Sequence, residues 1–127
     1  MKQFALILLS CSLLAGCSTP EKPSLASNDP SLAIPAMEQA SHNHDKSAIP
    51  QLIKNLDSDD PAVRFYAITS LKEITGKTFD YRYYDDETGR SPAVKRWQQW
   101  LKEQTATQDN QKSVKPQDTN APASQHS

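Results

Sequence analysis

The chain has 127 residues and a formal net charge of −1, and eight of its nine aromatic residues fall between Phe65 and Trp100. A chain of this length has room for one small domain, whose core must lie where the aromatic residues are. The nearly balanced charge argues against nucleic-acid binding, which needs a basic face.

The first residues combine a positive start, a short apolar run and a cysteine. Lys2 precedes the apolar residues Phe4–Leu9, which are too few to span a membrane but suit the central region of a signal peptide. The segment Leu14-Ala15-Gly16-Cys17 resembles the lipobox of bacterial lipoproteins. The resemblance implies that residues 1–16 are removed as a signal peptide and that Cys17 is lipidated, with several acyl chains forming a stable membrane anchor.

Two other interpretations of this region stay open: an ordinary signal peptide with an incidental cysteine, and a cytosolic protein with an apolar start. A competing lipidation site at Cys11 fits less well, because bulky Leu9 lies where a small residue is usual. Cleavage before Cys17 would leave no second thiol for a disulfide or a thiol metal site. In a Gram-negative cell, Ser18 after the cysteine implies, by the same resemblance, an outer-membrane lipoprotein facing the periplasm.

Residues 17–46 are predicted to be a lipidated, disordered tether. The segment is rich in Ser, Pro, Asn and Ala, and we expect at most a transient helical turn over residues 33–39. His42, His44 and Asp45 are weak metal-ligand candidates, because two imidazoles and a carboxylate could hold zinc or copper. The alternative is a polar linker with incidental histidines, since metal sites usually need three or four ligands in a fixed geometry.

Residues 47–104 are predicted to form a small three-helix domain of the all-α class. The first helix carries apolar residues at the spacing of one helical face, Ile49, Leu52, Ile53 and Leu56. Ser47 is a suitable N-cap for this helix, and Pro50 falls in its first turn.

The second helix is predicted from Pro61 to Thr75, with Asp60 as its N-cap and Gly76 as its left-handed C-cap. Its inner stripe consists of Val63, Ala67, Leu71 and Ile74, and Phe65 and Ile68 widen the apolar face. The charged residues of the first two helices are expected to be mostly solvated: Lys54, Arg64, Lys72 and Glu73.

The order of these features resembles a HEAT-type repeat. An apolar helix, an Asp/Pro turn and a helix with Val63-Arg64 followed by alanine and leucine cover Ser47–Thr75. Only one full repeat is present, whereas solenoids usually need three or more to bury a continuous core. The chain must therefore complete its core in another way.

A third helix, Ser91–Gln104, is expected to complete it. Ser91 is a suitable N-cap and Pro92 a suitable first residue. Residues 74–81 and 93–101 resemble the closing unit of certain bacterial HEAT-like proteins, and we expect Trp97 to pack on the first two helices while Phe79 holds the intervening loop. Residues 105–127 contain no aromatic residue and are predicted to be a disordered polar tail.

Nothing in the sequence indicates catalysis. The adjacent carboxylates of the loop Tyr81–Glu87 lack the spacing of an EF-hand, and no nucleophile, phosphate-binding glycine loop or histidine relay is present. We therefore expect no enzyme and no cofactor. Tyrosine and arginine suit recognition instead, and the candidate partner-binding residues are Tyr81, Arg82, Tyr83, Tyr84, Arg96 and Trp100. Alternatively, Arg96 bridges Asp85 or Asp86.

These features predict a membrane-anchored envelope lipoprotein that acts as a protein–protein interaction or scaffold module for another envelope protein. One alternative is a small-ligand- or metal-binding lipoprotein that uses the Tyr81–Glu87 loop or His42 and His44. A ligand-binding role predicts a concave pocket lined by Phe79, Tyr81 and Trp100. The other alternative is a passive envelope spacer.

Overall fold

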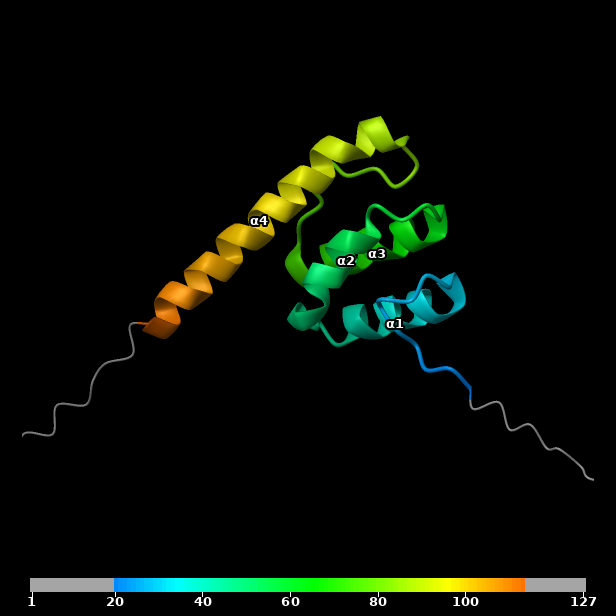
Figure 1. Cartoon of the computed structure of the whole chain (residues 1–127), viewed down its shortest axis with the longest axis horizontal. Coiled ribbons are helices and arrows are strands. Elements are labelled where there is room, and N and C mark those ends of the chain that lie inside the picture. Colours follow the sequence, from blue (N-terminus) through cyan, green and yellow to red (C-terminus); the bar gives the residue numbers. More distant parts are fainter. Residues whose placement is uncertain (1–19, 114–127) are drawn as a thin grey trace, which may run out of the picture.

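The fold is all-helical, as predicted. A computed structural model of the chain describes residues 20–113, which contain no strand. The signal peptide, Cys17 and the tail beyond Ser113 lie outside the described residues. The elements in chain order are α1 (Pro30–His42), a short 3₁₀ helix η1 (Lys46–Ala48), α2 (Ile49–Asn55), α3 (Pro61–Thr75) and α4 (Glu87–Ser113), shown in Figure 1.

Helix α3 is the centre of the domain. Helices α1 and α2 both pack against it, and α4 contacts α2 from the other side. The fully buried side chains include Leu52 and Leu56 from the α2 segment and Leu71 from α3. In Figure 1, the second half of α4 extends away from the other helices toward the C-terminus. The core therefore lies among η1, α1–α3 and the first half of α4, together with Tyr81 from the loop before α4.

The prediction of a disordered tether over residues 17–46 is wrong for Pro30–His42, which forms α1. The side chain of Asp29 accepts a hydrogen bond from the Ser31 N–H and caps the helix, with Pro30 in the first turn. The buried face of α1 consists of Ala33, Ala36, Met37 and Ala40. Alanine permits a close approach to α3, where the Ser70 hydroxyl donates to the Met37 carbonyl at 3.1 Å.

The α2–α3 pair follows the local signals in the sequence. Asp60 accepts hydrogen bonds from the N–H groups of Ala62 and Val63 and caps α3, and Gly76 ends it in the left-handed conformation at φ 72°. The prediction that Ser47 caps the first helix of this pair is wrong. Asp45 caps the preceding η1 instead, and its carboxylate accepts a hydrogen bond from the Ser47 N–H. The side chains of Lys54, Lys72 and Glu73 are exposed, as expected.

The third predicted helix is longer than Ser91–Gln104. Helix α4 begins at Glu87 and reaches Ser113, so Pro92 lies inside it. The prediction of a disordered tail over residues 105–127 is therefore wrong for residues 105–113, which are helical. Asp86 takes the capping position that we assigned to Ser91, since its carboxylate accepts from the Gly89 N–H at 2.8 Å. None of the helices in residues 20–113 has the length and apolar character to cross a membrane.

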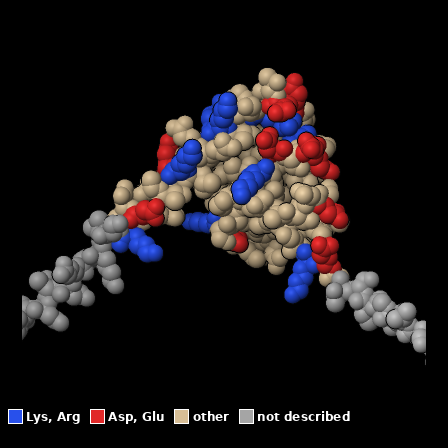
Figure 2. Space-filling model, viewed as in Figure 1, with Lys and Arg blue, Asp and Glu red and all other residues tan. Residues whose placement is uncertain are grey.

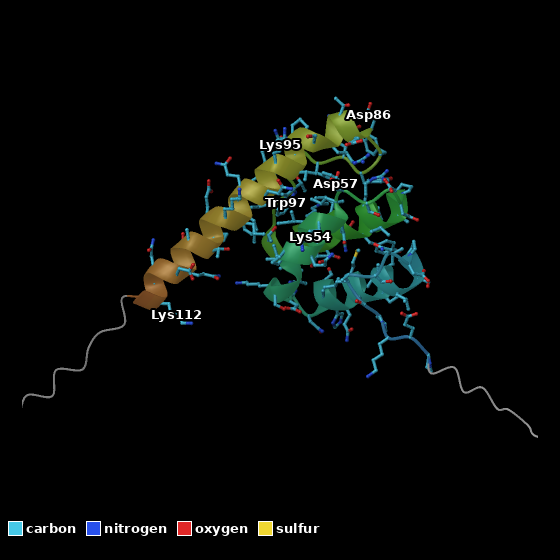
Figure 3. The ribbon with its side chains drawn as sticks, in the orientation of Figure 1. Lys54, Asp57, Asp86, Lys95, Trp97 and Lys112 are labelled. Atoms are coloured by element: carbon cyan, nitrogen blue, oxygen red, sulfur yellow. The ribbon has the colours of Figure 1, made fainter. Side chains whose placement is uncertain are left out.

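Trp97 joins α4 to the core, as predicted. Its side chain is fully buried and lies between α4 and the other helices in Figure 3. The Phe79 ring meets it edge to face, with ring centroids 4.8 Å apart. Phe79 and Asp80 adopt left-handed backbone conformations, which turn the loop after α3 back toward the core. Phe79 thus holds the loop that leads to the candidate site.

Candidate functional site: an aromatic patch with acidic neighbours

Four aromatic side chains form a continuous row at the start of α3 and on the loop before α4. The ring of Phe65 meets Tyr66 and Tyr83 edge to face at centroid distances of 5.5 and 5.1 Å, and Tyr83 meets Tyr84 at 5.3 Å. Phe65 and Tyr84 are the large apolar residues that the domain leaves exposed, at 42% and 67% of their surface. We call Phe65, Tyr66, Tyr83 and Tyr84 the aromatic patch.

Arg64 fixes the loop that carries the patch. Its side chain is buried, which corrects the expectation that it is solvated. The Nε atom donates to the Tyr83 carbonyl at 2.9 Å, and one terminal nitrogen donates to the carbonyls of Ser58 and Asp59 at 2.7 and 2.8 Å. A rigid guanidinium fork suits this role, because its donors diverge in one plane. The guanidinium therefore joins the α2–α3 turn to the loop beneath Tyr83.

Arg90 makes a second attachment from α4. Its side chain is buried, and one terminal nitrogen donates to the Asp85 carbonyl at 2.6 Å. The Arg90 Nε atom has no hydrogen-bond partner among residues 20–113. The loop is thus held from two helices by two buried arginines, so Tyr83 and Tyr84 are presented on a fixed backbone and not on a free loop.

Tyr81 does not belong to the exposed surface, which corrects its assignment as a partner-binding residue. The side chain is buried, and its hydroxyl donates to the Leu56 carbonyl. Burial raises the pKa of Tyr81 to about 12; Asp57 adds to this rise and the cations Arg90 and Arg64 oppose it. Tyr81 anchors the loop at the end of α2, and its neighbour Arg82 is exposed.

The other two candidates lie apart from the patch. Arg96 donates to the Phe79 carbonyl at 3.2 and 2.8 Å, and this replaces the expected bridge to Asp85 or Asp86. Trp100 is half-buried and belongs to a second aromatic cluster with Phe79 and Trp97. Of the six predicted partner-binding residues, Tyr83 and Tyr84 thus lie in the patch and Arg82 is exposed beside it, whereas Tyr81 lies in the core and Arg96 and Trp100 lie on α4 near Phe79.

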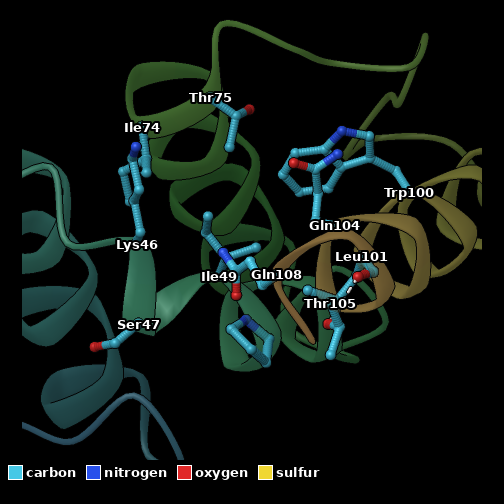
Figure 4. A pocket seen from close by; sticks show the side chains of 11 residues that line it. Lys46, Ser47, Ile49, Ile74, Thr75, Trp100, Leu101, Gln104, Thr105 and Gln108 are labelled. Atoms are coloured by element: carbon cyan, nitrogen blue, oxygen red, sulfur yellow. Dashed lines mark hydrogen bonds between the residues drawn. The ribbon is translucent and has the colours of Figure 1, made fainter. Parts of the chain in front are cut away.

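Trp100 lines a cavity of about 480 Å³ where α4 diverges from α2 and α3. Figure 4 shows Ile49, Ile74, Leu101 and Gln104 around it. The predicted ligand pocket is wrong in its composition, because neither Phe79 nor Tyr81 lines this cavity. Its walls combine apolar side chains with the polar side chains of the distal half of α4.

The histidine segment does not assemble a metal site. His42 and His44 lie with Glu38 and Glu73 around a shallow cavity of about 470 Å³ between α1 and α3. Asp45 is engaged by Ser47, whose hydroxyl and backbone N–H both donate to its carboxylate, and these bonds lower the pKa of Asp45. Within residues 20–113, no group of three or more His, Cys, Asp or Glu side chains has a metal-binding arrangement.

Acidic residues lie in two segments that adjoin the loop of the aromatic patch. One group belongs to the α2–α3 turn and the other to the start of α4; together they are Asp57, Asp59, Asp60, Asp85, Asp86 and Glu87, which we call the acidic rim. Arg64 holds the two groups together through its bonds to the turn and to Tyr83. Figure 2 shows acidic side chains gathered at the upper right of the domain, where α4 begins.

Sequence reasoning missed Phe65, Tyr66 and Arg64 as parts of this site. Phe65 was assigned to the apolar face of its helix, although it lies outside the inner stripe. Arg64 has the same spacing to Ile68 and Leu71 as the buried residues of one helical face. That spacing was the available signal that its stem is buried.

Comparison with known proteins adds no relative. No family model matches the chain, and no match is found among characterised proteins or among solved structures.

Proposed function

We propose that this protein is an envelope lipoprotein, lipidated at Cys17, whose helical domain acts as a non-catalytic protein–protein interaction module at the membrane surface. The aromatic patch is the observation that carries this proposal. Aromatic side chains on a fixed backbone give a large contact area at a small entropy cost, and tyrosine adds a polar hydroxyl. The exposed surface of Phe65 and Tyr84 adds nothing to the stability of the domain by itself, and a partner would bury it.

The proposed HEAT-type character concerns the α2–α3 pair. These two helices, the Asp-rich turn and the buried Ala67 fit the repeat pattern, and α1 and α4 supply the contacts that neighbouring repeats make in a solenoid. The proposal treats the chain as a single repeat unit completed by two helices of another kind.

The structure shortens the tether that the proposal needs. The Ser24 N–H donates to the Leu32 carbonyl at 3.0 Å, and the Leu25 carbonyl accepts from Asn55 at 2.9 Å, so the chain is fixed to the domain from Ser24 onward. Six residues separate Ser24 from Cys17. Fully extended, this segment spans at most about 25 Å. A lipid at Cys17 would therefore hold the domain close to the bilayer.

Site-specific photo-crosslinking tests the interaction. A photoreactive phenylalanine analogue at Tyr84 of the full chain, expressed in its own organism, should give a discrete crosslinked protein in the membrane fraction, identified by mass spectrometry. The same analogue at exposed Lys102 on α4 is the matched control. Phe65→Ala in the Tyr84 crosslinking chain should reduce the product. Equal products from Tyr84 and Lys102, or none from either, would contradict the proposal.

The anchor is tested separately. Intact-mass analysis of the membrane-associated protein should show an acylated N-terminal cysteine that begins at Cys17, and Cys17→Ser should release the protein from the membrane fraction. A protein that keeps residues 1–16, or that stays in the membrane as Cys17→Ser, would contradict the lipoprotein assignment.

A small-ligand role has one observation in its favour, the cavity beside Trp100. An apolar ligand there would change the fluorescence of Trp100, and Ile74→Arg should abolish that change without affecting crosslinking from Tyr84. The two functions thus depend on different faces of the domain and give separate results.

A further inference from the structure

The carboxylates of the acidic rim are mostly unused by the fold. Asp60 caps α3 and Asp86 caps the start of α4. Four side chains accept no hydrogen bond from residues 20–113: Asp57, Asp59, Asp85 and Glu87. Asp57, Asp59 and Glu87 are also exposed. These carboxylates add negative charge to the surface next to the patch. They make no hydrogen bond within the described residues that would give them a structural role.

The cations at this end of the domain do not balance that charge at the surface. Arg64 and Arg90 are buried and direct their guanidinium groups to backbone carbonyls. Arg82 on the loop and Lys54 beside the α2–α3 turn are exposed cations, so two exposed cations face six carboxylates. In Figure 3, Asp57 and Asp86 lie at the end of the domain where α4 begins, whereas Lys112 lies at the far end of α4.

Both features of this end favour the same ligand chemistry. The face of an aromatic ring attracts ammonium and guanidinium groups, and Tyr84 has two-thirds of its surface available. Asp85 directly follows Tyr84 in the chain, and a carboxylate near the ring strengthens the attraction for a cation. An anionic partner would meet six carboxylates, and a purely apolar partner would strip them of water without supplying a counter-charge.

We propose that the aromatic patch and the acidic rim together bind a lysine- or arginine-bearing segment of the partner polypeptide. This inference rests on the proposed interaction function and specifies its chemistry. The basic side chains stack on Tyr84 and Phe65, and their charged ends reach Asp59, Asp85 and Glu87. Arg64 serves as a positioning residue, because it holds the two acidic groups at the fixed separation that the segment meets.

The test uses the full-length mature protein in detergent and three synthetic peptides of equal length. One peptide alternates lysine and arginine with glycine and serine, and in the others the basic residues are replaced by glutamine or by glutamate. Binding is measured by fluorescence anisotropy of a dye on the peptide. The basic peptide should bind at least about tenfold more tightly than the glutamine peptide, and this preference should fall as the salt is raised from about 50 to 200 mM.

Two sets of variants locate the binding. Tyr84→Ala should weaken the basic peptide about three- to tenfold, and this residue is exposed enough that its loss leaves the fold intact. The double variant Asp59→Lys and Glu87→Lys should reverse the preference toward the glutamate peptide. Each single variant, Asp59→Lys or Glu87→Lys, should weaken the preference for the basic peptide. Glu103→Lys on the distal half of α4, which is exposed and remote from the loop, makes the same charge change as either single variant and should leave the preference unchanged.

The possible outcomes distinguish failure of this inference from failure of the proposed interaction function. A protein crosslinked from Tyr84 through a segment without lysine or arginine would leave the interaction function standing and overturn the basic-segment inference. Equal binding of the basic and glutamine peptides, or no effect of Tyr84→Ala, would also overturn it. Crosslinking of Tyr84 to lipid alone would show that the patch faces the membrane, and both proposals would then fail.

Discussion

Replacing Arg64 tests whether a buried arginine is what holds the candidate site together. Arg64→Met keeps an unbranched apolar stem in place of the arginine stem but removes the guanidinium and all three of its hydrogen bonds to the carbonyls of Ser58, Asp59 and Tyr83. A hydrogen bond from a charged group contributes about 1.5–3 kcal/mol. The three are not additive, because two come from one nitrogen, and because removing the cation also removes the cost of burying it. We expect a net loss of about 2–4 kcal/mol.

Urea unfolding followed by circular dichroism measures this loss, and thermal unfolding gives an independent value. In a domain of this size, each kcal/mol corresponds to a fall in Tm of about 4–8 °C. Arg82→Met is the matched control, since Arg82 is exposed and should change stability by no more than about 0.5 kcal/mol. Arg64→Lys should recover less than half of the loss, because one ammonium group cannot span the three carbonyls.

Hydrogen exchange distinguishes the proposed role from simple core packing. If Arg64 fixes the loop, its loss should speed exchange at the Asp85 N–H, which donates to the Arg82 carbonyl in the loop turn. Exchange in the middle of α3 should change only as much as global stability does. The reasoning is refuted if Arg64→Met and Arg82→Met have equal stability, or if the loop exchanges no faster than the rest of the domain.

Three further predictions concern the core and the turns. Tyr81→Phe should cost about 1 kcal/mol at neutral pH, because the hydrogen bond to the Leu56 carbonyl is lost. The pKa of Tyr81 is about 12 in the folded state and about 10 in the unfolded state, so the unfolded state ionises first as the pH rises. Between pH 10 and 12 the free energy of unfolding of the wild type should therefore fall by up to about 2 kcal/mol relative to that of Tyr81→Phe, after allowance for solvent screening. Urea unfolding that gives the two proteins the same pH dependence would contradict this. Met37→Ala should lower the free energy of unfolding by about 2–4 kcal/mol, because the Met37 side chain is fully buried. Glu38→Ala, at an exposed position of the same helix, should leave stability unchanged. Equal effects of the two variants in urea unfolding would mean that α1 does not pack on α3. Gly76→Ala should lower the stability by about 1 kcal/mol in thermal unfolding despite open space around its Cα, because φ is +72°, and an unchanged Tm would contradict the left-handed cap.

Elements whose limits are encoded locally could be predicted from the sequence. Helix α3 begins and ends where expected, because Asp60-Pro61 and Gly76 are strong signals that tertiary contacts do not override. At α4 two such signals compete, and the weaker one prevails. Ser91-Pro92 is the better local start, yet Asp86 caps the helix and buried Arg90 attaches its first turn to the loop. Both contacts are local, between residues three and five positions apart, so the sequence does contain the signal for this boundary, and the stronger Ser91-Pro92 signal obscured it.

Helix α1 was missed for a different reason. Its buried residues Ala33, Ala36, Met37 and Ala40 do have helical spacing, but three of the four are alanines, which contribute little apolar surface each. Pro35 inside the segment further weakens the helical signal. Such a helix is stable only because it packs closely against a second face of α3, where Ser70 lies. The face of α3 can be predicted from its sequence, but the segment that covers it cannot.

The docking of α1 also bears on where the candidate site would lie in the envelope. Leu25 is bound by Asn55, the last residue of α2, and the acidic rim begins two residues later at Asp57. Ser27 and Asn28 line one cavity together with Asp57 and Asp59. The chain that leads to Cys17 therefore passes the α2–α3 turn and leaves the domain on the side of α1, whereas the start of α4 lies on the opposite side (Figure 1). With a lipid at Cys17 and a tether of at most about 25 Å, the α1 side would face the bilayer, and the basic partner segment must reach a domain held close to the membrane or belong to a membrane protein.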